Sequence, residues 1–250
     1  MLQIKNLSKN FGGVSALNGL DLNIDVGQIF GVIGPNGSGK STLVNVICGV
    51  LPPTAGDVYL EGNSIIGKPP HARLRDGVAR TFQNIRLFPG LTVWQNLWVA
   101  RNSWEDVKKE NSFSRWFGKS SAAKSEIESM LEFSGLSHKS DELASSLAFG
   151  EQRRLELARA VAAKPRLLLL DEPAAGMNRK EIEDLDARIR SLQKQGTTIL
   201  LVEHVMELVM GVTDHIIVLN FGSKIAEGSP KDIQNSNEVQ EAYLGHPEVS

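Results

Sequence analysis

Cysteine is nearly absent from this 250-residue chain, in which Cys48 is the only one. A single cysteine cannot build an internal disulfide framework, and its scarcity fits a reducing compartment. Long apolar runs are missing too, since stretches such as Leu167–Leu170 are far too short to cross a bilayer. Residues 1–5 show no basic region followed by an apolar one, so no secretory signal is expected. Any membrane role would therefore come through partner chains.

The chain also lacks an excess of charge of either sign. The 27 lysines and arginines nearly balance the 29 acidic residues, which gives a formal net charge of -2. Nothing in this balance indicates a nucleic-acid surface, so no nucleic-acid partner is expected. With 41% hydrophobic residues, the composition is typical of a globular protein with one sizeable core.

Strand and helix patterns alternate at both ends of the chain and predict a largely parallel α/β sheet. Residues 28–33 are apolar, which is typical of a strand buried on both faces. Residues 91–162 are helical in pattern and are interpreted as an inserted helical subdomain. Further expected elements are short strands within 1–33, broken at Gly12–Gly13 and Gly27, strands at 56–60, 166–170 and 197–202, and helices at about 39–49, 179–195 and 230–245.

A glycine-rich segment follows the buried strand. It fits the pattern G-x-x-x-x-G-K-[ST] and consists of Gly34, Pro35, Asn36, Gly37, Ser38, Gly39, Lys40, Ser41 and Thr42. Glycines let backbone N–H groups converge on phosphate oxygens, and the following helix points its positive end at the same anion. Lys40 is expected to contact the β- and γ-phosphates, and Ser41 to offer a hydroxyl to Mg²⁺. A dinucleotide fingerprint does not fit, because Thr42 stands where its next glycine is required.

Two acids follow the apolar run 166–170. Asp171 is placed to hold Mg²⁺, and Glu172 is the candidate to polarise the attacking water because a carboxylate can accept its proton. Alone, this pair is equally consistent with a solvated acidic turn. Together with the phosphate loop it indicates nucleotide hydrolysis, and the lack of an N-K-x-D guanine motif argues against a GTPase.

The segment Leu147-Ala148-Phe149-Gly150-Glu151-Gln152-Arg153-Arg154 precedes a predicted helix. It resembles the L-S-G-G-Q signature of ATP-binding cassette proteins, which caps the γ-phosphate held by the other protomer. Gly150 suits that role, because it exposes a backbone N–H at a helix N-terminus. The resemblance implies that the ATP of a partner subunit is bound by Ala148, Phe149, Gly150 and Glu151.

Other motifs of this family occur in the expected order along essentially the whole chain. Phe11 stands where the family stacks an aromatic ring on adenine. Gln83 resembles the glutamine that senses Mg²⁺ and the membrane subunits, and His204 resembles the switch histidine at the γ-phosphate. Residues 174–178 stand where the family has its inter-protomer loop. With ATP and Mg²⁺ as cofactors, the resemblance assigns catalysis to Glu172, His204 and Gln83, and metal binding to Ser41, Gln83 and Asp171.

The resemblance also implies a fold and a set of partners. The expected fold is a P-loop NTPase (RecA-like) α/β core with an antiparallel β subdomain and an inserted helical subdomain at about 91–162, in a single domain over 1–250. Expected partners are a second ATPase subunit, identical or paralogous, and two hydrophobic membrane permease subunits. A substrate-binding protein would act indirectly, and the chain would lie peripherally on the cytoplasmic face of the membrane.

Variants within the motifs point to a subgroup. Ala148 replaces the signature serine, and Asn178 replaces the usual aspartate of the inter-protomer loop. These variants and the ending Glu241–Gly245 resemble ATPases of branched-chain and neutral amino-acid importers. The alternatives are importers of urea or short amides and, more distantly, the ATPase of lipopolysaccharide export. A soluble, non-transport cassette protein is a different class, which would carry long coiled-coil inserts or two cassettes in one chain.

Residues outside the motifs have plainer interpretations. Trp94 and Trp98 are expected in the core of the helical subdomain, and Arg153 and Arg154 on a helix surface or near phosphate. The polar stretch 101–125 either folds its aromatic residues back on the subdomain or contacts a membrane partner; these residues are Trp104, Phe113, Trp116 and Phe117. Surface or packing roles are expected for four histidines, His71, His138, His215 and His246.

Overall fold

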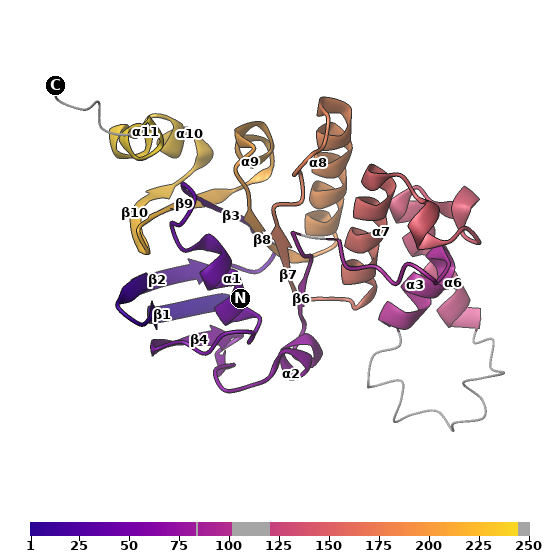
Figure 1. Cartoon of the computed structure of the whole chain (residues 1–250), viewed down its shortest axis with the longest axis horizontal. Helices are drawn as coiled ribbons and strands as arrows, with labels where there is room; N and C mark the ends of the chain where they lie inside the picture. Colours follow the sequence, from indigo (N-terminus) through magenta and orange to yellow (C-terminus); the bar gives the residue numbers. More distant parts are fainter. Residues whose placement is uncertain (84, 102–120, 245–250) are drawn as a thin grey trace.

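The computed structural model describes residues 1–83, 85–101 and 121–244. The aromatic residues predicted to fold back or to contact a membrane partner, Trp104, Phe113, Trp116 and Phe117, lie outside this part, as do Gly245 and His246. Two β-sheets organise the described residues, with helices beside them (Figure 1).

The first sheet is antiparallel, with strand order β2-β1-β4-β5. The breaks predicted at Gly12–Gly13 and Gly27 are confirmed, but the two strands before Gly27 are long rather than short, with 10 and 11 residues. The pairing of β1 with β2 shifts register at three places, and such bulges interrupt the alternation from which strand length is predicted. The strands are β1 (Leu2–Phe11), β2 (Val14–Ile24), β4 (Ala55–Leu60) and β5 (Asn63–Ser64).

The second sheet has the order β10-β9-β3-β8-β7-β6 and is parallel except at the edge strand β10. Strands β3, β7 and β8 are buried at every residue, which explains their continuous apolar sequences. The largely parallel sheet predicted from the sequence is confirmed. Its strands are β3 (Ile29–Ile33), β6 (Val78–Arg80), β7 (Leu167–Asp171), β8 (Thr198–Val202), β9 (His215–Asn220) and β10 (Ser223–Gly228).

Alternate residues of the parallel strands enter different cores. Leu167 and Leu169 join the cluster that α1 (Lys40–Ile47) shares with the antiparallel sheet. Leu168 and Leu170 point to the other face and pack against α8 (Arg179–Lys194), α9 (Met206–Val212) and part of α7 (Phe149–Ala162). The parallel sheet is therefore covered on both faces. The short helix α2 (Pro70–Arg75) leads into β6.

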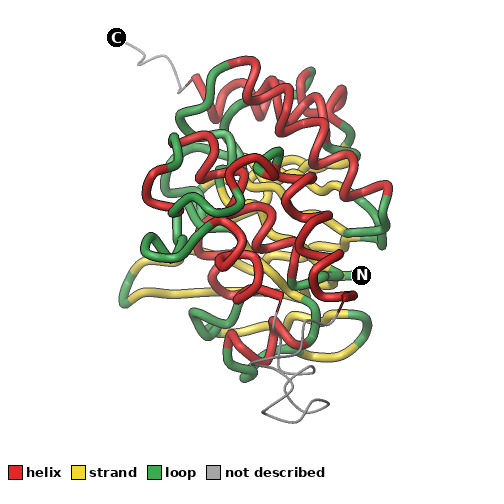
Figure 2. Tube along the Cα trace, turned by 90° about the vertical axis from the view of Figure 1, so that its right-hand side faces the viewer, coloured by secondary structure: helices red, strands yellow, loops and turns green. Residues whose placement is uncertain are grey.

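Helices α3 (Val93–Arg101) and α6 (Ser121–Ser134) pack with α7 around a separate apolar cluster. Seen from that side, these helices stand in front of the strands (Figure 2). Residues 135–148 form two short 3-10 turns, Ser137–Lys139 and Ala144–Ser146, so helix does not run continuously here. Trp94 is half-buried against the cluster, but the prediction of a core position for Trp98 is wrong. Its ring stacks on Trp94 at 6.4 Å and stays 39% exposed.

The C-terminal segment forms two helices, α10 (Pro230–Gln234) and α11 (Asn237–Leu244), where one was predicted. The break comes at Asn235, which ends α10, and Ser236, whose hydroxyl accepts a hydrogen bond from Val239 N at 3.4 Å. Ile233 and Val239 anchor the two helices on β9. None of the helices in the described ranges combines the length and the apolar character that a membrane crossing needs.

The described histidines without motif positions have the plain roles predicted for them. His71 and His138 are exposed. His215 is half-buried, with its ring 5.4 Å from Phe30 and Nε2 3.2 Å from Glu227 Oε1. These three residues therefore lie at the surface or in side-chain packing.

Candidate nucleotide-binding and catalytic site

The glycine-rich loop joins the end of β3 to the start of α1. Gly34 has φ +149°, and a Cβ there would lie 2.1 Å from the Leu219 carbonyl oxygen. Gly39 has φ +107°, and a Cβ there would lie 2.5 Å from the Ala16 carbonyl oxygen. No side chain fits at either position. Gly37, with φ +81°, has open space around its Cα, so the loop can approach a ligand closely there.

Lys40 is folded under this loop and is only 6% exposed. Its Nζ donates hydrogen bonds to the carbonyl oxygens of Gly34 at 2.7 Å and Pro35 at 2.9 Å. An ammonium has three donors, so one remains for an anion. Burial lowers the pKa of Lys40, while Glu172 and Asp171 oppose that shift.

The other polar residues of the loop differ in exposure. Ser38 is 1% exposed, and its hydroxyl has no hydrogen-bond partner among the described residues. Ser41 and Asn36 are exposed, whereas Thr42 and Pro35 are half-buried. A buried hydroxyl without a partner is costly, and phosphate oxygens would satisfy it.

Asp171, the last residue of β7, is 4% exposed. Arg80 on β6 donates to Asp171 Oδ2 at 3.0 Å and to Asn45 Oδ1 on α1 at 2.6 Å. Burial raises the pKa of Asp171, and the Arg80 guanidinium acts against that rise. Sequence reasoning missed Arg80, because β6 has three residues and no motif marks the position.

Glu172 and Gln83, two of the predicted catalytic residues, are in direct contact. Gln83 Nε2 donates to Glu172 Oε2 at 2.8 Å. The Glu172 backbone has φ +49°, which a residue with a side chain rarely adopts, and its N–H donates to the Val202 carbonyl at 2.8 Å. Such backbone strain persists only where surrounding contacts enforce it, and it clusters at functional sites.

His204 lies two residues beyond β8, and its side chain is 56% exposed. Glu203, between β8 and His204, is fully buried and accepts hydrogen bonds from three backbone N–H groups. Strands β3, β8 and β7 are parallel neighbours, so the phosphate loop, His204 and Glu172 meet at one edge of the sheet. No motif carried by the sequence analysis pointed to Glu203.

Phe11 ends β1 and pairs with Val14 across the tight turn to β2. Its ring is 47% exposed, and Lys9 Nζ lies 5.0 Å from the ring centroid. The close approach of Ala16 on β2 to Gly39 places this hairpin beside the phosphate loop. An exposed aromatic face next to a phosphate site can stack on a nucleotide base.

The signature segment begins α7. Ala148 is the N-cap residue but has no side-chain acceptor. Glu151 Oε2 accepts a hydrogen bond from the Ala148 N–H at 3.0 Å and another from Lys139 Nζ at 3.0 Å. Phe149 is 51% exposed, and a Cβ on Gly150 would lie 2.4 Å from Glu181 Oε1. Helices α1 and α7 lie on opposite sides of β7 (Figure 1). The structure therefore does not bring this segment to the phosphate loop of the same chain.

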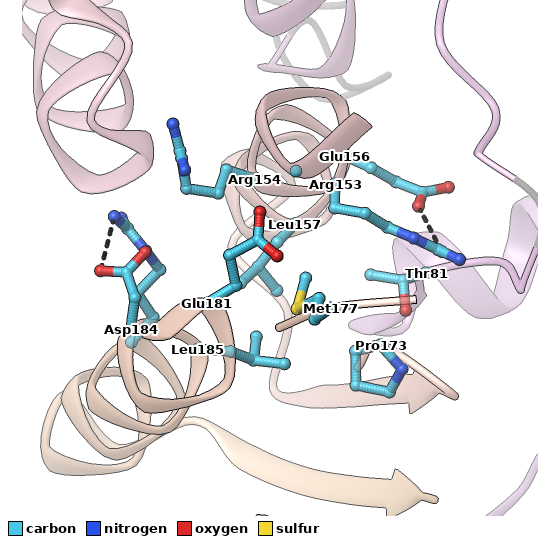
Figure 3. A pocket seen from close by; sticks show the side chains of 12 residues that line it. Thr81, Arg153, Arg154, Glu156, Leu157, Pro173, Met177, Glu181, Asp184 and Leu185 are labelled. Atoms are coloured by element: carbon cyan, nitrogen blue, oxygen red, sulfur yellow. Dashed lines mark hydrogen bonds and ion pairs between the residues drawn. The ribbon is translucent and has the colours of Figure 1, made fainter. Parts of the chain in front are cut away.

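Of the two positions predicted for Arg153, the one on a helix surface is wrong, since the residue is 8% exposed and points toward the segment after β6. Its guanidinium donates to the Phe82 carbonyl at 3.0 Å and the Gln83 carbonyl at 2.6 Å. Figure 3 shows Arg153 with its partner Glu156 in the pocket between α7 and α8. Arg154 stays at the surface of α7 and donates to the Ser134 carbonyl at 3.0 Å.

Two further residues of α7 hold the same segment. Glu156 Oε1 accepts from Arg86 N at 3.1 Å, and Arg159 donates to the Arg86 carbonyl. Burial raises the pKa of Glu156 and lowers that of Arg159. Arg153, Glu156 and Arg159, named here the α7 clasp, thus grip the backbone of the segment that carries Gln83.

Asn178 stands in the loop after Glu172, where the family usually has aspartate, and its local hydrogen bonds explain why asparagine is tolerated. It caps α8, because its Oδ1 accepts from Glu181 N at 3.1 Å and its own N–H donates to Glu181 Oε2 at 2.9 Å. Asparagine and aspartate are about equally good N-caps, so the change keeps this capping box.

The arrangement suits hydrolysis of a phosphate anhydride. A cradle of backbone N–H groups with a lysine can bind the phosphates, and the two carboxylates at the end of β7, Asp171 and Glu172, can hold a cation and accept a proton from water. The donor set of Ser41, Asp171 and Gln83 consists of oxygen groups, which fits Mg²⁺.

Comparisons with known proteins agree with this geometry. A sequence model of the family described as ABC transporter matches residues 17–175, and one described as branched-chain amino acid ATP-binding cassette transporter matches residues 223–249. The high-affinity branched-chain amino acid transport ATP-binding protein BraF of Pseudomonas aeruginosa is 42% identical over 98% of each chain.

Solved structures are similar as well. The ADP conformation of MJ1267, an ATP-binding cassette of an ABC transporter, has a TM-score of 0.84 and 33% identity, covering 98% of this chain and 99% of that one. The dimeric structure of MJ0796, a bacterial ABC transporter cassette, has a TM-score of 0.79 and 26% identity, covering 92% and 99%. The P-loop NTPase fold predicted from the sequence is confirmed, and the chain belongs to the ABC transporter family as an ATP-binding ATPase cassette.

Proposed function

We propose that this chain is the ATP-hydrolysing subunit of an importer for branched-chain or other neutral amino acids. The observation that carries the proposal is the 42% identity to BraF over 98% of both chains, together with the family match at residues 223–249. Importers of urea or short amides and lipopolysaccharide export remain the alternatives for the cargo, and none of the residues that the structure describes favours them.

In this proposal the loop 34–42 binds the phosphates of ATP. Lys40 directs its remaining donor to the β- and γ-phosphates, and the Ser38 hydroxyl gains a partner on the same anion. Phe11 stacks on the adenine. Ser41, Asp171 and Gln83 would hold Mg²⁺, which would supply positive charge to neutralise the phosphates. The oxygen donors at this edge of the sheet support that assignment.

Glu172 accepts a proton from the attacking water, Gln83 orients Glu172 through their hydrogen bond, and His204 contacts the γ-phosphate. The contact between Gln83 and Glu172 supports a joint role, because a base that is oriented by a second group is pre-organised for proton transfer. When ATP binds, the α7 clasp would link the segment that carries Gln83 to α7, the helix that begins with the signature residues.

The site needs a second cassette, identical or paralogous. Residues 148–151 lie on the side of β7 opposite α1, so they bind the ATP of a partner rather than their own. The dimeric form of MJ0796 supports this assembly by similarity. Two membrane permease subunits bind the cassettes on the cytoplasmic face of the membrane, and a substrate-binding protein acts indirectly. Residues 101–125 remain a candidate contact with a permease.

The test is uptake in the native host. Lys40→Ala should abolish uptake of radiolabelled leucine at low concentration, since the unpaired phosphate charge prevents ATP binding. Arg179→Ala, on an exposed turn of α8, is the matched control and should leave uptake unchanged. If leucine uptake persists in Lys40→Ala while urea or amide uptake collapses, the cargo assignment fails and the ATPase assignment stands. If no import changes and lipid export does, the direction of transport is wrong.

A further inference from the structure

Glu203 is a carboxylate with no contact to solvent, held between two loops. Its Oε1 accepts a hydrogen bond from Ala174 N at 2.7 Å. Its Oε2 accepts from His204 N at 2.9 Å and from Val205 N at 3.1 Å. Within the described ranges it pairs with no lysine or arginine; the nearest basic atom is His204 Nδ1 at 3.8 Å.

A purely structural role does not explain why a carboxylate stands at position 203. Burying a charge is costly, and an apolar side chain would fill the same space more cheaply. The bonds to His204 and Val205 do not cap the short helix α9, because its N-cap residue is Val205 and no side chain accepts from its first turn. Local bonding also does not account for the bond to Ala174, which belongs to a different loop, 29 residues away in sequence.

The two loops are those that carry the proposed catalytic groups. Ala174 lies two residues after Glu172, and His204 is the immediate neighbour of Glu203. The strands before them, β7 and β8, are parallel neighbours in register Asp171 to Val202. Glu203 therefore fixes the distance between these loops beyond the point where the sheet ladder ends.

We propose that Glu203 is a positioning residue for ATP hydrolysis: its buried carboxylate holds the peptide of His204 against the loop that follows Glu172. The inference rests on the proposed function, because it takes His204 to contact the γ-phosphate. Both carboxylate oxygens accept hydrogen bonds. An amide in place of the carboxylate would set its NH₂ group against at least one backbone N–H and push the two loops apart.

The first test compares nucleotides in Glu203→Gln. Only ATP has the γ-phosphate that His204 contacts, so Mg-ATP affinity in titration calorimetry should fall by about threefold to tenfold while ADP affinity stays within twofold. kcat for ATP should fall by about tenfold or more. Equal losses for ATP and ADP would reveal a general loss of structure and overturn the inference.

The second test is a double-mutant cycle on kcat with His204→Ala. If Glu203 acts through His204, the double variant should have the kcat of His204→Ala alone, because the second change removes nothing further. Losses that multiply would overturn the inference. Ile189→Val, which removes one buried methyl group from the core of α8, controls for stability and should leave the ratio of ATP to ADP affinity unchanged.

The outcomes also separate this inference from the proposed function. If the wild-type protein hydrolyses ATP and Glu203→Gln retains its kcat, the inference fails and the proposed function stands. If the wild-type protein binds no ATP, the proposed function fails and the inference with it.

Discussion

At the scale of single residues, Glu172 combines a strained backbone with a hydrogen bond from Gln83. A glutamine at this position keeps the shape and the hydrogen-bonding reach but cannot accept a proton. We therefore expect Glu172→Gln to bind Mg-ATP with near wild-type affinity and to lower kcat by roughly 10²–10⁴-fold. Turnover of ATP by the purified protein, read beside equilibrium binding, measures both. Turnover at the wild-type rate would mean that another group accepts the proton.

Several site residues could be recognised from the sequence because they belong to local patterns. The glycines, Lys40 and Asp171 follow strands whose apolar sequences are visible without a structure. Arg80 and Glu203 could not be recognised in this way. Their importance comes from partners far away along the chain, Asp171 for the first and Ala174 for the second. No periodic pattern encodes such a contact.

At the scale of helices and strands, α7 begins with a weak cap. Ala148 has no side-chain oxygen, so only the half of the capping box made by Glu151 is present. Ala148→Ser should add the missing acceptor and raise the free energy of unfolding by about 1 kcal/mol. For a domain of this size that corresponds to a rise in Tm of about 2–4 °C, measurable by calorimetry. Ala148→Val, which adds no acceptor and is as poor an N-cap residue as alanine, is the control. An unchanged Tm in Ala148→Ser would contradict the proposed effect of the cap.

The bounds of strands and helices were predicted best where the residues are completely buried and less well where they are only partly buried. Strands β3, β7 and β8 and the amphipathic helix α8 lie within a few residues of their predicted bounds. The bulged strands β1 and β2 are longer than predicted, and the two C-terminal helices were merged, because bulges and short capped turns interrupt the patterns only locally. The three-residue strand β6 is too short to show a period at all.

At the scale of the whole molecule, the signature segment and the phosphate loop are separate surfaces of one chain. A change at the first should therefore spare ATP binding to a monomer and still prevent assembly. Ala148→Asp suits this test, since aspartate is a good N-cap but places a negative charge where the γ-phosphate of a partner would lie. In a Glu172→Gln background, size-exclusion chromatography should show an ATP-dependent dimer, with itself or with its paralogous cassette.

The same assay should show only monomer once Ala148→Asp is added, with ATP affinity retained. Ala148→Ser in that background is the matched variant without the charge and should still dimerise. An ATP-dependent dimer of the aspartate variant would place the interface elsewhere.

Among the described residues, the hydrogen bonds of the α7 clasp to the Gln83 segment go to main-chain atoms: the carbonyls of Phe82, Gln83 and Arg86 and the N–H of Arg86. Main-chain groups are the same whatever side chain the residue bears. Phe82 and Arg86 can therefore be exchanged in evolution while the grip itself persists. A cassette of this kind can therefore change its outward side chains toward a different partner while the hydrogen bonds from α7 to the segment stay the same.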